Sequence, residues 1–182
     1  MFEIEKKYNI PQEAIPRLRE AIEARYGAPR SLQEEDLHGY TSPTKNYLRL
    51  RRSGSELKLI AKGPSTVTFD GIKQRLEVEI PIAQAFASHA RQLVELLIVE
   101  PLPGLRRERL VWQAQSDAEI VMDFLEALPD SVFVEVEVLS TDQETAREQL
   151  RELERQLGLH PEWQELRNYG QILQDCILFP PA

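Results

Sequence analysis

Two spacings of apolar residues alternate along the chain. In eight segments, apolar and polar residues alternate with a period of two, which is typical of strands with one buried face. Other segments repeat apolar residues every three or four positions, which is typical of amphipathic helices. The strand pattern covers residues 1–8, 32–40, 47–53, 56–62, 74–80, 105–115, 118–125 and 131–139.

The helical spacing predicts four helices between these strands. They are expected from Pro11 to about Gly27, over residues 86–97, from about residue 141 to Gly158, and over about residues 161–175. Thr141, with Glu144 three positions later, forms a capping-box pattern at the start of the third helix.

Two connections are predicted from local signals. Residues 41–46 contain Ser42-Pro43 and indicate a turn, and residues 63–71 indicate a loop. Asp70 and Lys73 are expected to be solvated residues of the segment before Gln74.

Composition narrows the class of protein. The 182 residues are 42% hydrophobic and 29% charged, which fits one globular domain spanning residues 1–182. The formal net charge of −8 argues against nucleic acid and anionic membranes as partners. No apolar run is long enough to span a membrane. The single cysteine, Cys176, excludes an internal disulfide framework and favours a cytoplasmic location.

The charged residues are sorted by sign among the predicted strands. One interpretation is an antiparallel sheet with its polar face in water. A face that needs only solubility would mix the signs, however, because like charges two residues apart repel each other. The alternative is a sheet that closes on itself, with helices outside and the charges in a lumen. The acidic pairs are Glu3/Glu5, Glu77/Glu79 and Glu135/Glu137, and the basic pairs are Arg49/Arg51 and Arg107/Arg109.

Such a lumen needs ligands, because buried charges without partners are costly. Clustered carboxylates suit hard divalent cations, and clustered arginine and lysine side chains suit a multiply charged oxyanion. A lumen that contains both kinds of cluster favours a metal-bound polyphosphate as the ligand. The sequence has no Walker A, Gly-x-Gly-x-x-Gly or His-Glu-x-x-His motif.

A series of short motifs, in order along nearly the whole chain, resembles the CYTH superfamily, the triphosphate tunnel metalloenzymes. The first is Glu3-Ile4-Glu5-Lys6-Lys7, which resembles the Glu-x-Glu-x-Lys signature. The others are Leu48-Arg49-Leu50-Arg51, Lys62-Gly63-Pro64, Arg75-x-Glu77-x-Glu79, Arg107-x-Arg109, Met122-Asp123 and Glu135-x-Glu137.

The resemblance implies an α+β fold, an eight-stranded antiparallel β-barrel forming a triphosphate tunnel, with helices packed outside, including C-terminal helices from about residue 141. It implies that Glu3, Glu5, Glu135 and Glu137 hold Mg²⁺ or Mn²⁺. Glu77, Glu79 and Asp123 would serve a second metal or orient the attacking water. The implied phosphate-binding residues are Lys7, Arg49, Arg51, Lys62, Arg75, Arg107 and Arg109.

The expected function is metal-dependent hydrolysis of inorganic triphosphate or a small organic triphosphate. Cyclisation of ATP on the same scaffold, or noncatalytic binding of polyphosphate or nucleotide, are the alternatives. Whether the chain forms a homodimer is left open. Some residues match the family pattern only in part and are given no role: Glu34, Asp36, His38, Tyr40, Lys58, Arg167 and Tyr169.

Overall fold

The chain divides into two units, each assembled from separate segments. The computed structural model describes residues 1–41 and 46–178, so the predicted turn at Ser42-Pro43 lies outside the described residues. Unit 1 consists of Met1–Leu32, Ser65–Arg75 and Glu108–Leu166. Unit 2 consists of Gln33–Pro64, Leu76–Arg107 and Arg167–Ala182. Three strands have residues in both units: β2 (Arg30–Tyr40), β6 (Lys73–Pro81) and β8 (Leu105–Gln115).

Unit 1 is built on long antiparallel strands. β10 (Val132–Ser140) pairs with β1 (Phe2–Ile10) on one side and with β9 (Ala118–Leu125) on the other. Side chains alternate along β1, so Ile4 and Tyr8 lie fully buried on one face, and Glu3 and Glu5 lie on the opposite face. The short strand β5 (Thr66–Val67) pairs with the first residues of β6.

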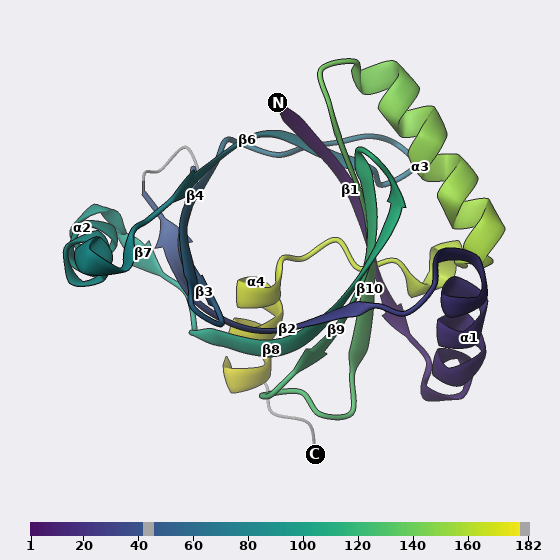
Figure 1. Ribbon diagram of the computed structural model, residues 1–182, viewed down its shortest axis with the longest axis horizontal. Coiled ribbons are helices and arrows are strands. Elements are labelled where there is room, and N and C mark those ends of the chain that lie inside the picture. The colour runs from purple at the N-terminus through teal and green to yellow at the C-terminus, as the bar shows by residue number, and fades with distance from the viewer. Residues whose placement is uncertain (42–45, 179–182) are drawn as a thin grey trace. The chain divides into compact units, whose positions relative to one another are not determined.

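Two helices cover the apolar face of unit 1. α1 (Ile15–Tyr26) follows the 3₁₀ turn η1 (Gln12–Ala14), and the C-terminal end of α3 (Gln143–Leu157) lies close to α1 in Figure 1. Their buried stripes pack with the apolar side chains of β1, β9 and β10 into one core. The largest fully buried members of this core are Trp112, Tyr8, Ile4, Ile22, Ile72, Ile120, Met122 and Leu150.

The start of α3 differs from the sequence prediction. The N-cap is Asp142, whose carboxylate accepts hydrogen bonds from the backbone N–H groups of Glu144 and Thr145. The sequence predicted Thr141 as the N-cap, one residue before Asp142, and this prediction is wrong by one position. The helix ends at Gly158, as predicted, and the φ of +65° there suits a residue without a side chain.

Unit 2 combines a meander of strands with two helices. β3 (Tyr47–Ser53) and β4 (Glu56–Lys62) form the predicted hairpin, β2 pairs with β3, and β6 pairs with β4. The two-residue β7 (Glu100–Pro101) pairs with β2 at Gly39, where a Cβ atom would lie 2.5 Å from the Glu100 carbonyl oxygen. α2 (Ala87–Leu97) follows η2 (Gln84–Phe86) and packs on β3.

The last predicted helix is displaced. Residues 161–163 form only the 3₁₀ turn η3 (Pro161–Trp163), and the helix α4 runs over Tyr169–Leu178. The backbone N–H of Glu165 donates to the carbonyl of Lys7 at 2.8 Å, so this segment bonds to β1 where a helix was expected.

Hydrogen bonding joins the main strands in the order β1-β10-β9-β8-β2-β3-β4-β6, and β6 also pairs with β1. β10 is antiparallel to β1 and β9, β3 is antiparallel to β2 and β4, and β4 is antiparallel to β6. Among the residues that the structure describes, no helix is both long and apolar enough to cross a membrane.

Candidate functional site

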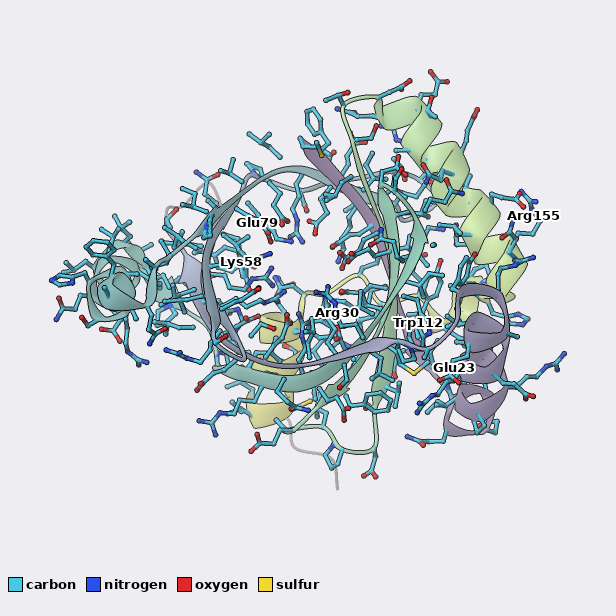
Figure 2. All side chains as sticks on the ribbon, in the orientation of Figure 1. Glu23, Arg30, Lys58, Glu79, Trp112 and Arg155 are labelled. Carbon is cyan, nitrogen blue, oxygen red and sulfur yellow. The ribbon has the colours of Figure 1, made fainter. Side chains whose placement is uncertain are left out.

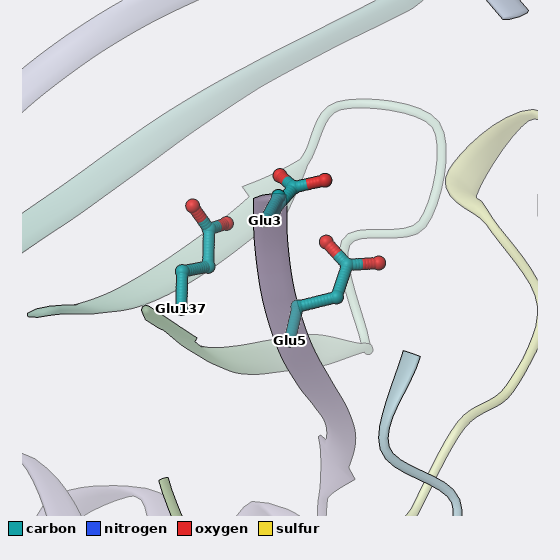
Figure 3. A group of neighbouring side chains, drawn as sticks. All are labelled: Glu3, Glu5 and Glu137. Atoms are coloured by element: carbon teal, nitrogen blue, oxygen red, sulfur yellow. The ribbon is translucent and has the colours of Figure 1, made fainter. Parts of the chain in front are cut away.

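A carboxylate cluster lies on the polar face of unit 1. The antiparallel register places Glu5 opposite Glu137 and Lys7 opposite Glu135, although these residues come from the two ends of the unit. One oxygen from each of Glu3, Glu5 and Glu137 lies within 4.8 Å of the others. Figure 3 shows the three carboxylates approaching one another from β1 and β10. The structure thus brings together three of the four predicted metal ligands.

The electrostatics of this cluster suit a cation. Burial raises the pKa of Glu137 well above its usual value, and Arg109 opposes this rise. The neighbouring charges of Glu135, Glu3 and Glu5 raise the same pKa further. A divalent cation reduces the repulsion between clustered carboxylates and favours their ionised forms. Carboxylate oxygens are also the ligands that Mg²⁺ and Mn²⁺ prefer. The donor set therefore fits the metal that the sequence predicts.

Arg75 borders the carboxylate cluster. Its Nε donates to Glu3 at 2.8 Å, and its Nη2 lies 3.3 Å from both oxygens of Glu5. A guanidinium held this way limits the repulsion between the two carboxylates. The predicted phosphate ligand Arg75 and two predicted metal ligands are therefore direct neighbours.

The fourth predicted metal ligand, Glu135, lies between two cations. Its carboxylate is 3.3 Å from the ammonium nitrogen of Lys7 and 2.7 Å from Nη2 of Arg109. Arg109 also donates from Nε and Nη2 to the two oxygens of Asp123, at 2.8 and 2.7 Å. Asp123 is fully buried and fixes the orientation of Arg109.

Unit 2 contains a separate network of arginines and acids. Arg51 donates from Nε and Nη2 to the two oxygens of Asp36, both at 2.8 Å. Arg107 donates from Nε and Nη2 to Glu34, at 2.9 and 2.6 Å. Burial alone would raise the pKa of Asp36, but the charges of Arg51 and Arg49 outweigh it, so the pKa lies far below its usual value. Asp36 is therefore a carboxylate at neutral pH.

Arg49 is held less tightly than its neighbours. Its Nη1 lies 3.5 Å from Asp36, and its buried Nε has no hydrogen-bond partner among the residues that the structure describes. Its guanidinium carbon is 6.0 Å from the centre of the Tyr47 ring. Of the predicted phosphate ligands in unit 2, Arg49 therefore offers a buried donor that an anion could satisfy.

The predicted acids of β6 form ion pairs with lysines of β4. Lys62 approaches Glu77 to 2.5 Å, and Lys58 approaches Glu79 to 2.9 Å. Figure 2 shows Lys58 and Glu79 on adjacent strands. Lys58, which the sequence left without a role, is thus the partner of Glu79.

Several other residues without a predicted role also have defined contacts. His38 accepts at Nδ1 from the Tyr47 hydroxyl and donates from Nε2 to the Pro103 carbonyl at 2.7 Å. Asn168 donates to the Tyr40 hydroxyl at 2.8 Å. The Tyr169 ring lies under Arg107, at 5.3 Å, and Arg167 pairs with Asp175 on the surface. These contacts support the arginines of unit 2 or the surface of α4.

Three charged residues were missed or left open by the sequence. Glu34 and Asp36 follow period two along β2, which could have placed them on one face, but the pairing register was needed to find their arginines. Lys73 is the first residue of β6 and is buried, which corrects the expectation of a solvated residue. Burial and the charge of Lys7 lower its pKa to about 8.

Comparisons with solved structures place the fold. The PH1012 protein of Pyrococcus horikoshii OT3 superposes with a TM-score of 0.73 at 20% identity, over 93% of this chain and 98% of that one. A Vibrio parahaemolyticus protein, provisionally described as an adenylate cyclase, superposes with a TM-score of 0.69 at 21% identity, over 96% of this chain and 98% of that one. HpAC1 of Hippeastrum, described as having a dominant triphosphatase activity, gives 0.65 at 17% identity, over 98% of each chain.

These likenesses confirm the predicted fold class, an α+β chain with an eight-stranded antiparallel β-barrel and helices packed outside. No curated protein is a significant match in sequence. The sequence matches the CYTH domain family over residues 1–169, which is most of its length. The family that the motifs predicted is thereby confirmed, and this chain belongs to the CYTH domain family.

Proposed function

We propose that this chain is a divalent-metal-dependent hydrolase of inorganic triphosphate or a small organic triphosphate. The observation that carries the proposal is the convergence of Glu3, Glu5 and Glu137, whose oxygens lie within 4.8 Å of one another. Cationic side chains border this cluster within the same unit. A metal site beside an anion site is what a metal-bound polyphosphate requires.

Glu3, Glu5 and Glu137 would hold Mg²⁺ or Mn²⁺ through carboxylate oxygens. The bound cation supplies Lewis-acid stabilisation of the negative charge that develops on phosphate oxygens during transfer. Glu137 must be ionised to serve as a ligand, so metal binding releases a proton from it at a pH below its raised pKa. Activity should therefore fall in acid.

The cations of unit 1 would bind and orient the phosphate chain. Arg75 and Arg109 have rigid guanidinium groups suited to phosphate oxygens, and Lys7 adds a point charge. Glu135 lies between Lys7 and Arg109 and holds both in place before substrate arrives. Such pre-positioning lowers the cost of ordering these long side chains on binding.

Family membership supports the proposal. The CYTH family includes triphosphatases, and HpAC1 is described by a dominant triphosphatase activity. At 17% identity this neighbour supports the fold alone, so the reaction rests on the residues of the cluster.

A substrate panel tests the proposal. The full chain is incubated with inorganic triphosphate, ATP and other small triphosphates, with Mg²⁺ or Mn²⁺, and both free phosphate and cyclic AMP are measured. We expect metal-dependent phosphate release that is lost with a chelator and in Glu5→Gln. Glu126→Gln, at an exposed position, serves as the control. Cyclic AMP without phosphate release would establish cyclisation instead, and binding without turnover would establish a noncatalytic module.

A further inference from the structure

Lys73 is a buried lysine at the margin of the carboxylate cluster. It begins β6, where its backbone pairs with Val67 of β5, and its exposed fraction is 8%. Lysine is rarely buried to this extent without a charged partner, because removing an ammonium group from water is costly.

The direction of the Lys73 side chain follows from its neighbours on β6. Arg147 of α3 donates to the side chain of Gln74, so Gln74 points to the helix-covered face of unit 1. Side chains alternate along a strand, and Lys73 and Arg75 therefore share the opposite face. Arg75 contacts Glu3 and Glu5 on that face. The ammonium group of Lys73 thus lies on the side of the carboxylate cluster.

Other buried lysines of the chain have carboxylate partners. Lys6, which is also 8% exposed, lies 2.8 Å from Glu154, Lys7 pairs with Glu135, and Lys62 pairs with Glu77. Lys73 has no hydrogen-bond or ion-pair partner of this kind within residues 1–41 and 46–178.

The charged residues around Lys73 do not form a structural ion pair with it that would explain its burial. Lys7 and Arg75 act on it as repulsive charges, and Glu5 and Glu135 as attractive ones. Both of these acids already contact other cations, Arg75 for Glu5 and Lys7 for Glu135. A phosphate group beside Lys7 and Lys73 would relieve the repulsion between the two ammonium groups and satisfy donors of both.

We propose that Lys73 is a further substrate-binding residue, which donates from its ammonium group to a phosphate oxygen of the anion bound beside Glu5 and Lys7. This inference rests on the proposed function, since it takes the anion to be a triphosphate. It assigns to Lys73 a direct contact with the substrate and no part in holding the metal.

The test compares Lys73→Met with Lys6→Met. Both substitutions remove the ammonium group of a lysine of unit 1 that is 8% exposed, but Lys6 lies on the other face of β1 and pairs with Glu154. Binding of inorganic triphosphate to the full chain is measured by calorimetry without added metal, and melting temperatures are recorded in parallel. Lys73→Arg, which keeps the charge, tests rescue.

We expect Lys73→Met to weaken triphosphate binding at least tenfold, about 1.4 kcal/mol, without lowering the melting temperature. Lys73→Arg should recover most of the affinity, and Lys6→Met should leave the affinity within about twofold, because it breaks only an ion pair on the other face. A structural role would instead lower the melting temperature of Lys73→Met and leave the affinity intact. If Lys73→Met does not fold, Lys73→Gln provides the same comparison.

Two outcomes separate the inference from the proposed function. Metal-dependent hydrolysis by the unchanged protein, together with unaltered triphosphate affinity in Lys73→Met, would overturn the inference alone. Absence of both triphosphate binding and hydrolysis in the unchanged protein would overturn both.

Discussion

The Asp123→Asn substitution tests how unit 1 holds its central arginine. Asp123 is fully buried and accepts two hydrogen bonds from Arg109, at 2.8 and 2.7 Å. Asparagine has nearly the same shape, but it carries no charge and presents an amino group to the guanidinium. Removing one partner of a buried ion pair costs about 3–5 kcal/mol, because the other charge remains buried.

The expected loss lies at the lower end of this range. Arg109 keeps its contact with Glu135 at 2.7 Å, so its charge is not left without a partner. We therefore expect the free energy of unfolding to fall by about 3 kcal/mol. For a chain of this size, a loss of 1 kcal/mol lowers the melting temperature by about 2–4 °C, which gives a fall of roughly 6–12 °C.

Urea unfolding, followed by the fluorescence of Trp112 and Trp163, measures this loss, because Trp112 is buried in the folded chain. The matched control is Asp117→Asn, an exposed aspartate whose side chain accepts from Gln149. We expect the control to stay within about 0.5 kcal/mol of the unchanged protein. A loss below about 1 kcal/mol in Asp123→Asn would refute the view that this ion pair anchors Arg109.

Three further predictions address ligands, pH and helix capping. Mg²⁺ and inorganic triphosphate together should raise the melting temperature more than the sum of their separate effects, since the cation would bridge protein carboxylates and phosphate. A ligand at a hundredfold excess over its Kd adds about 2.7 kcal/mol to the free energy of unfolding. Strictly additive shifts in melting curves would contradict this prediction. Burial lowers the pKa of His38, so the folded state favours the neutral ring. The contribution of His38 to stability is therefore present above the unfolded pKa of about 6.5. It is lost as the pH falls below that value, by up to about 1.4 kcal/mol per pH unit. Denaturant titrations from pH 7 to 5 should show a shallower loss in His38→Gln, and an unchanged slope would oppose this reasoning. Asp142→Ala should cost about 1 kcal/mol through loss of the α3 cap, whereas Thr141→Ala should cost little, and equal shifts in thermal melts would show that the cap is misassigned.

The face of each charged residue on the long strands could be predicted from the sequence. Period-two alternation separates Glu3, Glu5 and Lys7 from Ile4, and the structure places these two groups on opposite faces. This works because a strand has a fixed side-chain period that is independent of its partners.

The grouping of the acids depended on strand register, which the sequence does not contain. Glu135 and Glu137 are equivalent by alternation, but the pairing of β1 with β10 sets Glu137 opposite Glu5 and Glu135 opposite Lys7. The two acids therefore differ in environment, one in the carboxylate cluster and one between cations. Only the hydrogen-bond register distinguishes them.

Tertiary contacts overrode local signals in two segments. Pro161 and the following pattern indicated a helix, but Gln164 bridges to Tyr8 of β1, and the helix begins only at Tyr169. Lys73 follows Gly71, which indicated a loop, whereas pairing with β5 makes it part of a strand. Local propensity is a weak guide where backbone groups find partners far away in the sequence.

Calorimetric titration of the full chain with Mn²⁺ tests whether Glu3, Glu5 and Glu137 form a divalent-metal site. We expect saturable Mn²⁺ binding that weakens at least tenfold, about 1.4 kcal/mol, in Glu5→Gln and in Glu137→Gln. The exposed control Glu126→Gln should bind as the unchanged protein does. Equal Mn²⁺ affinity in the unchanged protein and in both cluster variants would show that Glu5 and Glu137 are not metal ligands.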